Sequence, residues 1–127
     1  MKFIDANIIA YASYNNEHQS HCQHILQSEN NVTDTMVLVE AFNIIELQIN
    51  REAAIIVIKS ILRSSMEIVN MDVNAIFEAL KKAEQYKQLK FLDLIHFTIA
   101  SLKNCDQIIS YDKDFDNLEI VRAEELK

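Results

Sequence analysis

The chain has 127 residues, half of them hydrophobic, which is enough to bury a core without disulfides or a structural metal. Twelve Lys and Arg against nineteen Asp and Glu give a net charge of −7, which excludes nucleic-acid binding through a broad positive face. Glycine and proline are absent, so the glycine-dependent phosphate loops and dinucleotide-binding turns are excluded as well.

The N-terminus and the cysteines bear on the compartment. An acid at the fifth residue comes too early for a signal peptide, and the longest clean apolar run, residues 53–58, is far shorter than the roughly 20 residues of a membrane span. Cys22 and Cys105 follow no recognised spacing, and we expect both to be small buried side chains in a reducing compartment. We therefore expect one cytoplasmic domain over residues 1–127, without contact to a membrane.

The first half of the chain alternates short apolar strands with helices. Hydrophobic periodicity predicts, in chain order, a strand over 2–4, a helix from about residue 7, a helix over 17–28, a strand over 31–34, and helices over 35–50 and 51–65. With no glycine, asparagine is the residue that best tolerates a positive φ. We expect turns at Asn15, Asn16, Asn30, Asn31, Asn70 and Asn104.

The second half continues the alternation. A strand over 66–71 precedes a helix over 72–87 that Asp72 caps, and then come a buried helix over 91–103, a strand over 106–110 and a last strand over 118–121. Strands that alternate with helices imply crossover connections. The fold class we predict is α/β, with three α/β/α layers and a mostly parallel central sheet.

Three acidic residues lie inside almost wholly apolar stretches: Asp5 in "KFID", Glu40 in "VLVEAF" and Asp93 in "FLDLIHF". A buried carboxylate costs several kcal/mol unless a partner compensates it. Asp5 ends one predicted strand and Asp112 follows another, so both can face one crevice at the carboxyl ends of the strands. We expect all four to share a pocket, in which a divalent cation keeps them charged. All-oxygen ligands favour Mg²⁺ or Mn²⁺.

Each acid has an ordinary structural alternative except one. Asp5 and Asp93 could instead cap helices, and turn chemistry would explain Asp112, Asp114 or Asp116 singly. Glu40 lies beyond the first turn of its helix among apolar neighbours, and neither explanation suits it.

Three segments together resemble PIN-domain ribonucleases: "FIDANIIAY", "TMVLVEAF" and "FLDLIHFTIASLKNCDQIISYDKDFDNL". The resemblance covers essentially the whole chain and is closest to single-domain prokaryotic members, including VapC-type toxins. It implies a PIN-like fold and an endoribonuclease that depends on one or two Mg²⁺ or Mn²⁺ ions. The acidic roles then fall to Asp5, Glu40, Asp93 and Asp112, and supporting roles to Asn7, Ser110 and Asp114. Glycines common before the last strand in family members are absent, and "KNCDQ" stands there instead.

The same resemblance suggests partners. The RNA-cleaving protein would be the toxin of a toxin–antitoxin pair, with an antitoxin protein as partner, or a stand-alone processing nuclease. The apolar segment 52–65 predicts a homodimer. Local basic residues near the motifs would contact RNA, and the candidates are Arg51, Lys87, Lys90 and Lys113. The alternative is a catalytically inactive PIN-like or receiver-like α/β module that binds proteins.

The histidines suggest two further hypotheses. His18, His21 and His24 with Cys22 resemble a zinc cluster, but helical geometry turns His24 away and no second ligand set accompanies them. His96 lies one turn after Asp93. We expect it to pack in the core, and a hydrogen bond to the Asp93 carboxylate is the alternative.

Overall fold

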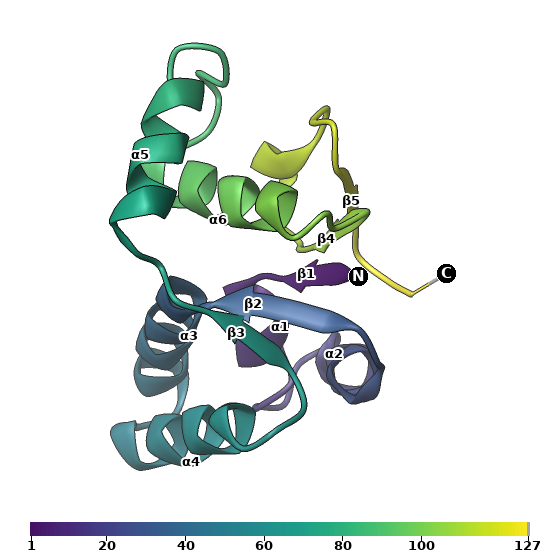
Figure 1. Cartoon of the computed structure of the whole chain (residues 1–127). Helices are drawn as coiled ribbons and strands as arrows, with labels where there is room; N and C mark the ends of the chain where they lie inside the picture. Colours follow the sequence, from purple (N-terminus) through teal and green to yellow (C-terminus); the bar gives the residue numbers. More distant parts are fainter. Residues whose placement is uncertain (127) are drawn as a thin grey trace.

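The computed structural model describes residues 1–126, and a parallel sheet of five strands forms its centre (Figure 1). The strand order is β3-β2-β1-β4-β5, and every neighbouring pair is parallel. The strands are β1 Lys2–Ile4, β2 Asn31–Asp34, β3 Glu67–Val69, β4 Gln107–Ile109 and β5 Val121–Ala123. The predicted parallel sheet is confirmed.

Helices cover both faces of this sheet, as the three-layer prediction requires (Figure 1). One face carries α1 Ala6–Tyr11, α2 Gln19–Gln27, α3 Thr35–Gln48 and α4 Arg51–Leu62. The other face carries α5 Val73–Lys82 and α6 Phe91–Leu102. Among residues 1–126, no helix is long and apolar enough to cross a bilayer.

The chain order of the strands creates a switch point beside the central strand. From β1 the chain builds outward through β2 to β3, and then crosses to the other side of β1 to form β4 and β5. Ile4 and Ile109 are paired, so the carboxyl ends of β1 and β4 lie side by side. Ligand sites in parallel sheets form at such a point, because the connections diverge there and leave a crevice.

The core explains why the strands are short and continuously apolar. Phe3, Ile4, Ile108 and Ile109 are fully buried, since helices cover both faces of β1 and β4. Helix α6 is buried from Leu94 through Ala100, in agreement with its apolar sequence. Cys22 and Cys105 are buried free thiols, as predicted.

Several predicted boundaries were wrong. The last strand begins at Val121 rather than at residue 118, because a 3₁₀ helix, η1 Lys113–Phe115, and a left-handed Asn117 (φ 65°) delay its pairing with β4. Ile120 is buried as part of this connection, so its apolar character reflects core packing rather than strand pairing. Helix α5 does begin after the Asp72 cap, but it ends at Lys82.

Asparagine does replace glycine at left-handed positions, although at fewer of the predicted sites. Asn30 and Asn104 have φ values of 63° and 56°, which confirms both. The remaining predicted turn residues, Asn15, Asn16, Asn31 and Asn70, are not in this region, and Asn31 lies within β2.

Candidate metal and catalytic site

Asp5 stands at the carboxyl end of β1 and is also the N-cap of α1. Its Oδ1 accepts a hydrogen bond from the Ala6 amide at 2.8 Å, and its Oδ2 accepts one from Ser110 Oγ at 2.6 Å. The side chain of Asn7 donates to the same Oδ2 at 3.3 Å. The capping alternative and the strand-end prediction are therefore both correct, and the carboxylate is held in one orientation.

A small polar network ties the end of β1 to the end of β4. The Asn7 amide also donates to Ser110 Oγ at 3.2 Å, and its Oδ1 accepts from the Tyr111 amide at 3.2 Å. Ser110 Oγ in turn accepts from the Asp112 amide at 2.9 Å. Asn7 thus contacts both Asp5 and Ser110, and Ser110 lies at the centre of the network.

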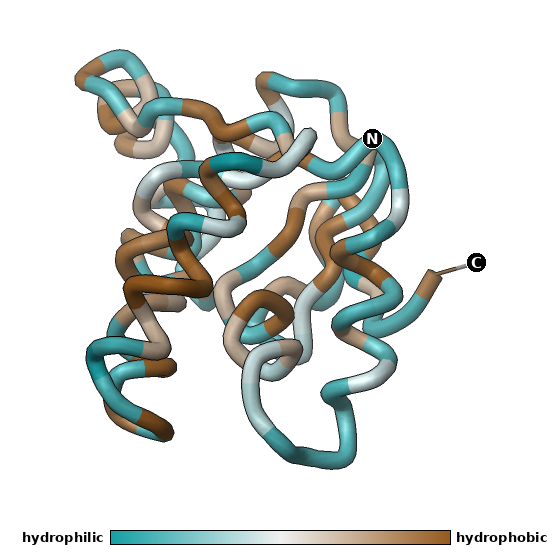
Figure 2. The backbone as a smooth tube through the Cα atoms, turned by 90° about the horizontal axis from the view of Figure 1, so that it is seen from below, coloured by the Kyte–Doolittle hydropathy of each residue, from teal (hydrophilic) through white to brown (hydrophobic). Residues whose placement is uncertain are grey.

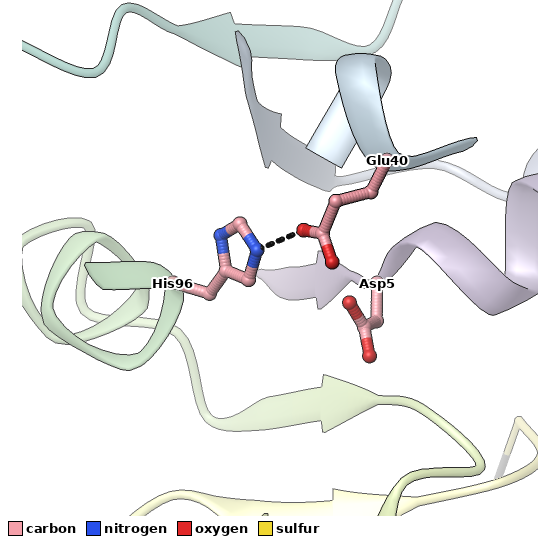
Figure 3. Close-up of side chains that lie close together, drawn as sticks. All are labelled: Asp5, Glu40 and His96. Atoms are coloured by element: carbon pink, nitrogen blue, oxygen red, sulfur yellow. Dashed lines mark hydrogen bonds and ion pairs between the residues drawn. The ribbon is translucent and has the colours of Figure 1, made fainter. Parts of the chain in front are cut away.

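Glu40 extends from α3 toward the same place, and Figure 3 shows its carboxyl group beside that of Asp5. His96 Nε2 lies 2.5 Å from Glu40 Oε1, and His96 Nδ1 lies 2.6 Å from Oδ2 of Asp34. Asp34 also caps α3 by accepting from the Val37 amide at 2.8 Å. His96 therefore bridges two carboxylates from the interior of α6.

The expectation that His96 packs in the core is confirmed, and the alternative of a hydrogen bond to Asp93 is not. The imidazole is fully buried and packs against Phe3, but its hydrogen-bond partners are Asp34 and Glu40, not Asp93. Burial alone would lower its pKa, yet the two hydrogen-bonded carboxylates outweigh burial and raise the pKa to about 10. At neutral pH the ring is an imidazolium that donates from both nitrogens. It then has no lone pair for a metal, although it lies close to Asp5 and Glu40.

A second group of acids faces the first. Asp93 lies in the first turn of α6, and one ligand atom each from Asp93, Asp112 and Asp114 falls within 4.8 Å of the others. Asp112 caps η1, and its Oδ1 accepts from the Asp114 amide at 2.9 Å. The turn chemistry that could explain Asp112 is present, and it orients this carboxylate.

The pKa values show that the two groups share one electrostatic environment. The pKa of Asp93 rises to about 6, first because of burial and then because of the charges on Asp112 and Asp5, with Glu40 contributing less. Burial also raises the pKa of Asp5, against hydrogen bonds from Ser110 and Ala6. Asp93 thus senses acids of both groups, and the four predicted acids lie in these two groups, Asp5 with Glu40 and Asp93 with Asp112. Burial contributes more to these two raised pKa values than repulsion between the acids does.

The structure separates the candidate zinc cluster. His18 packs against aromatic rings, His21 Nε2 lies 3.0 Å from the Glu124 carbonyl, and His24 is exposed. Within residues 1–126, the groups whose ligand atoms converge are the two acidic ones, and these histidines belong to neither.

Sequence reasoning missed Asp34. Its spacing before α3 is that of a helix N-cap, which gave no reason to expect a second role. Of the basic candidates, Arg51 forms an ion pair with Glu46, while Lys90 immediately precedes α6 and Lys113 follows Asp112. These three residues and the fourth candidate, Lys87, are all exposed.

Comparison with known proteins finds several of similar fold. No curated protein matches the chain by sequence. Among solved structures, Mycobacterium tuberculosis VapC20, described as a sarcin-ricin loop cleaving toxin, is 16% identical with a TM-score of 0.81, over 95% of this chain and 99% of that chain. A toxin–antitoxin complex from Klebsiella pneumoniae is 16% identical with a TM-score of 0.73, over 95% of both chains. Rickettsia felis VapBC2, bound to promoter DNA, is 18% identical with a TM-score of 0.71, over 96% of both.

These likenesses establish the fold, and the family follows from the sequence itself. The family model described as "PIN domain" matches residues 2–121, nearly the whole chain. The receiver-like alternative is therefore wrong. Since this match covers nearly the whole chain, the chain belongs to the PIN-domain family.

Proposed function

We propose that this protein is a metal-dependent endoribonuclease that hydrolyses RNA phosphodiester bonds. The observation that carries the proposal is the pair of acidic groups at the switch point of the sheet, Asp5 with Glu40 and Asp93 with Asp112, which are coupled electrostatically. Membership of the PIN family supports it, as does the likeness to VapC20, which is described as a sarcin-ricin loop cleaving toxin. A PIN-like module without activity is the alternative outcome.

The donor set fits a hard divalent cation. The four carboxylates offer oxygen ligands only, which suits Mg²⁺ or Mn²⁺ better than zinc. Asp5, Glu40, Asp93 and Asp112 would hold one or two ions, with Asp114 beside them. When bound, such an ion activates water and offsets negative charge on the phosphate.

The protein's own residues orient these acids before any ion arrives. Ser110 and Asn7 donate hydrogen bonds to Oδ2 of Asp5. His96 donates to Oε1 of Glu40, and Oε2 of Glu40 takes no part in that hydrogen bond. Such supporting hydrogen bonds fix ligand direction and tune basicity. Asp93, with a pKa of about 6, must release its proton before it can serve as a ligand, so we expect activity to rise between about pH 5 and 7.

RNA contact would be local, because the net charge is −7. Lys90 and Lys113 lie next to α6 and Asp112 respectively, and both are exposed and positioned to approach a phosphate near the acids. Arg51 is the weaker candidate, since Glu46 already pairs with its charge.

Incubation of the purified protein with mixed RNA tests the function. We expect fragments in the presence of Mn²⁺ or Mg²⁺ and none with excess chelator, because the acids alone cannot activate water. Intact RNA at all metal concentrations, from a protein with a normal melting curve, would instead favour the inactive module.

We extend the proposal to an antitoxin partner. Two of the structural neighbours, from Klebsiella pneumoniae and Rickettsia felis, are toxin–antitoxin assemblies. A stand-alone processing nuclease has the same chemistry, and co-purification with a small neighbouring gene product distinguishes the two.

We also predict a homodimer. Helix α4, which overlaps the predicted segment 52–65, exposes Ile56 at 64% and Leu62 at 58%, and Leu47 on the adjoining α3 is 86% exposed. Figure 2 views the molecule from the side of α1–α4 and shows hydrophobic segments in the helices at the left. Apolar exposure on this scale favours association. Light scattering at tens of micromolar should give twice the chain mass, and a monomer mass would contradict the prediction.

Metal should stabilise the folded protein. The pKa of Asp5 and Asp93 is raised, so their contribution to stability is present below about pH 3.8 and is lost as pH rises, through about 6 for Asp93. At neutral pH the metal-free site is therefore unfavourable. An ion that binds only the folded state contributes about 2.7 kcal/mol at a hundredfold excess over Kd, and Tm should rise by several degrees.

Thermal melts with and without Mn²⁺ or Mg²⁺ measure this effect. The rise in Tm should disappear in the double variant Asp5→Asn/Asp93→Asn, which should be no less stable than metal-free wild type. Asp72→Asn is the matched control, because it removes an exposed carboxylate but keeps the cap of α5. An equal rise in the double variant would exclude a cation site at these acids.

A further inference from the structure

A hollow of about 570 Å³ lies between α2 and the C-terminal strand β5, apart from the acids. Its lining comes from both ends of the chain: His18, His21, Tyr111, Arg122, Ala123, Glu124 and Glu125. A volume of this size suits a small planar group with room for its attachment to a longer molecule.

Aromatic rings gather at this hollow. The centroids of His18 and Tyr111 are 4.4 Å apart, and Tyr11 stacks on His18 at 5.7 Å with an interplanar angle of 22°. The Tyr111 hydroxyl lies 3.8 Å from Cys22 Sγ, and this contact helps to hold the ring in place. The His18 side chain is 38% exposed. Rings held in place in this way form a stacking surface with little conformational entropy left to lose.

Tyr111 links the hollow to the acidic site along the chain. Tyr111 stands between Ser110, which contacts Asp5, and Asp112, and its amide donates to Asn7. Tyr111 therefore belongs both to the lining of the hollow and to the segment that carries Ser110 and Asp112. For a single-stranded substrate cut at those acids, we infer that a base stacked on Tyr111 belongs to a nucleotide near the scissile phosphate.

The charges select a base rather than a phosphate. Arg122 is the one cation of the lining apart from the histidines, and its guanidinium is paired with Asp116 and Glu124, each at 2.6 Å. Glu125 adds a further negative charge. A phosphate would meet net repulsion here. An uncharged base would not, and the amino groups of adenine, guanine and cytosine can donate to a carboxylate.

We propose that this hollow binds one unpaired base of the RNA substrate, stacked on His18 and Tyr111 next to the scissile phosphate. The proposal rests on the proposed nuclease function and adds a specificity determinant to it. It follows that the substrate is cut where a base is free to leave its helix, because a paired base has no exposed face for these rings.

Fluorescence of 2-aminopurine tests base binding without cleavage. Single-stranded RNA that carries this base at successive positions is titrated with Asp5→Asn protein in Mg²⁺, which should leave the RNA intact. We expect quenching at one position. His18→Ala in the same background should weaken binding of that RNA by about 5- to 100-fold, the range found for loss of one stacked base.

Matched variants separate stacking from charge and from folding. His24→Ala removes an exposed histidine from the same helix and should change nothing. His18→Phe and Tyr111→Phe keep a ring and should retain quenching, whereas Tyr111→Leu should lose it. Equal weakening by His18→Ala and His24→Ala, or failure of His18→Phe to restore binding, would overturn the proposal.

A cleavage assay with an abasic nucleotide at the quenched position completes the test. Wild type should cut abasic RNA more slowly, and His18→Ala should cut intact and abasic RNA alike. If wild type cleaves RNA and no position shows quenching or an abasic effect, the base site is refuted while the nuclease stands. If quenching depends on His18 but no RNA is cleaved, the nuclease is refuted while the base site stands.

Discussion

Asp5→Asn protein should fold normally and lose RNA cleavage by about a thousandfold or more. The estimate follows from the several kcal/mol of transition-state stabilisation that a correctly held cation supplies. The substituted side chain keeps an acceptor for the Ala6 amide, so α1 retains its cap. The new amide replaces Oδ2, which accepts hydrogen bonds from Ser110 and Asn7, so both of these bonds are affected, but the change also removes a buried charge. Initial rates on a fixed RNA substrate, with circular dichroism of both proteins, measure the effect.

Asp72→Asn provides the comparison for this loss. It makes the same chemical change at a helix cap outside the site and should leave cleavage at the wild-type rate. Full activity in Asp5→Asn protein, with cleavage otherwise dependent on metal, would refute the role of Asp5.

His96→Ala should lower the free energy of unfolding by about 3 to 5 kcal/mol, the cost of removing one partner from a buried charge network. The change leaves Asp34, which is fully buried, without its imidazolium, and releases Glu40 as well. Urea unfolding followed by circular dichroism measures the loss. Thr98→Val, a buried polar change on the same helix that removes one hydrogen bond to Leu94, is the control and should cost only about 1 kcal/mol.

A second variant keeps this prediction specific. Asp34→Asn combined with His96→Ala removes the uncompensated charge and should recover part of the lost stability, despite two substitutions. Additive losses would mean that His96 stabilises the fold by packing alone.

The same bridge gives a pH dependence of known sign. The pKa of His96 is raised from 6.5 to about 10, so its contribution to stability is fully present below about pH 6.5 and is lost as pH rises through about 10. Wild type should therefore lose stability between pH 8 and 10 more steeply than the double variant Asp34→Asn/His96→Ala does.

Much of the site could be predicted because each acid follows from a local rule that the fold respects. Asp5 and Asp112 end parallel strands, and the ends of adjacent parallel strands must meet. Glu40 had no satisfactory alternative within its helix, and the structure places its carboxylate close to Asp5 and His96. These inferences needed only the order of elements, which the apolar periodicity supplies.

The Asp34–His96–Glu40 bridge could not be predicted in this way. His96 is 62 residues from Asp34 and 56 residues from Glu40 along the chain. Asp34 and His96 each have a sufficient local explanation, as a helix cap and as a buried ring. The start of β5 was mistaken for a related reason: residues 118–121 alternate as a strand does, but Asn117 and η1 place the pairing later. Local patterns describe burial well, and they do not specify which distant residue completes a contact.

The central position of β1 has a consequence for when the protein can become active. Asp5 obtains its hydrogen bond from Ser110, 105 residues later in the chain, and β1 meets β4 only after the crossover through α5 and α6. During synthesis, β1, β2 and β3 with their helices can form first, but the acids from the second half have not yet been made. An emerging chain thus carries half of the acidic site. The nuclease activity that we propose would therefore arise only when translation is nearly finished.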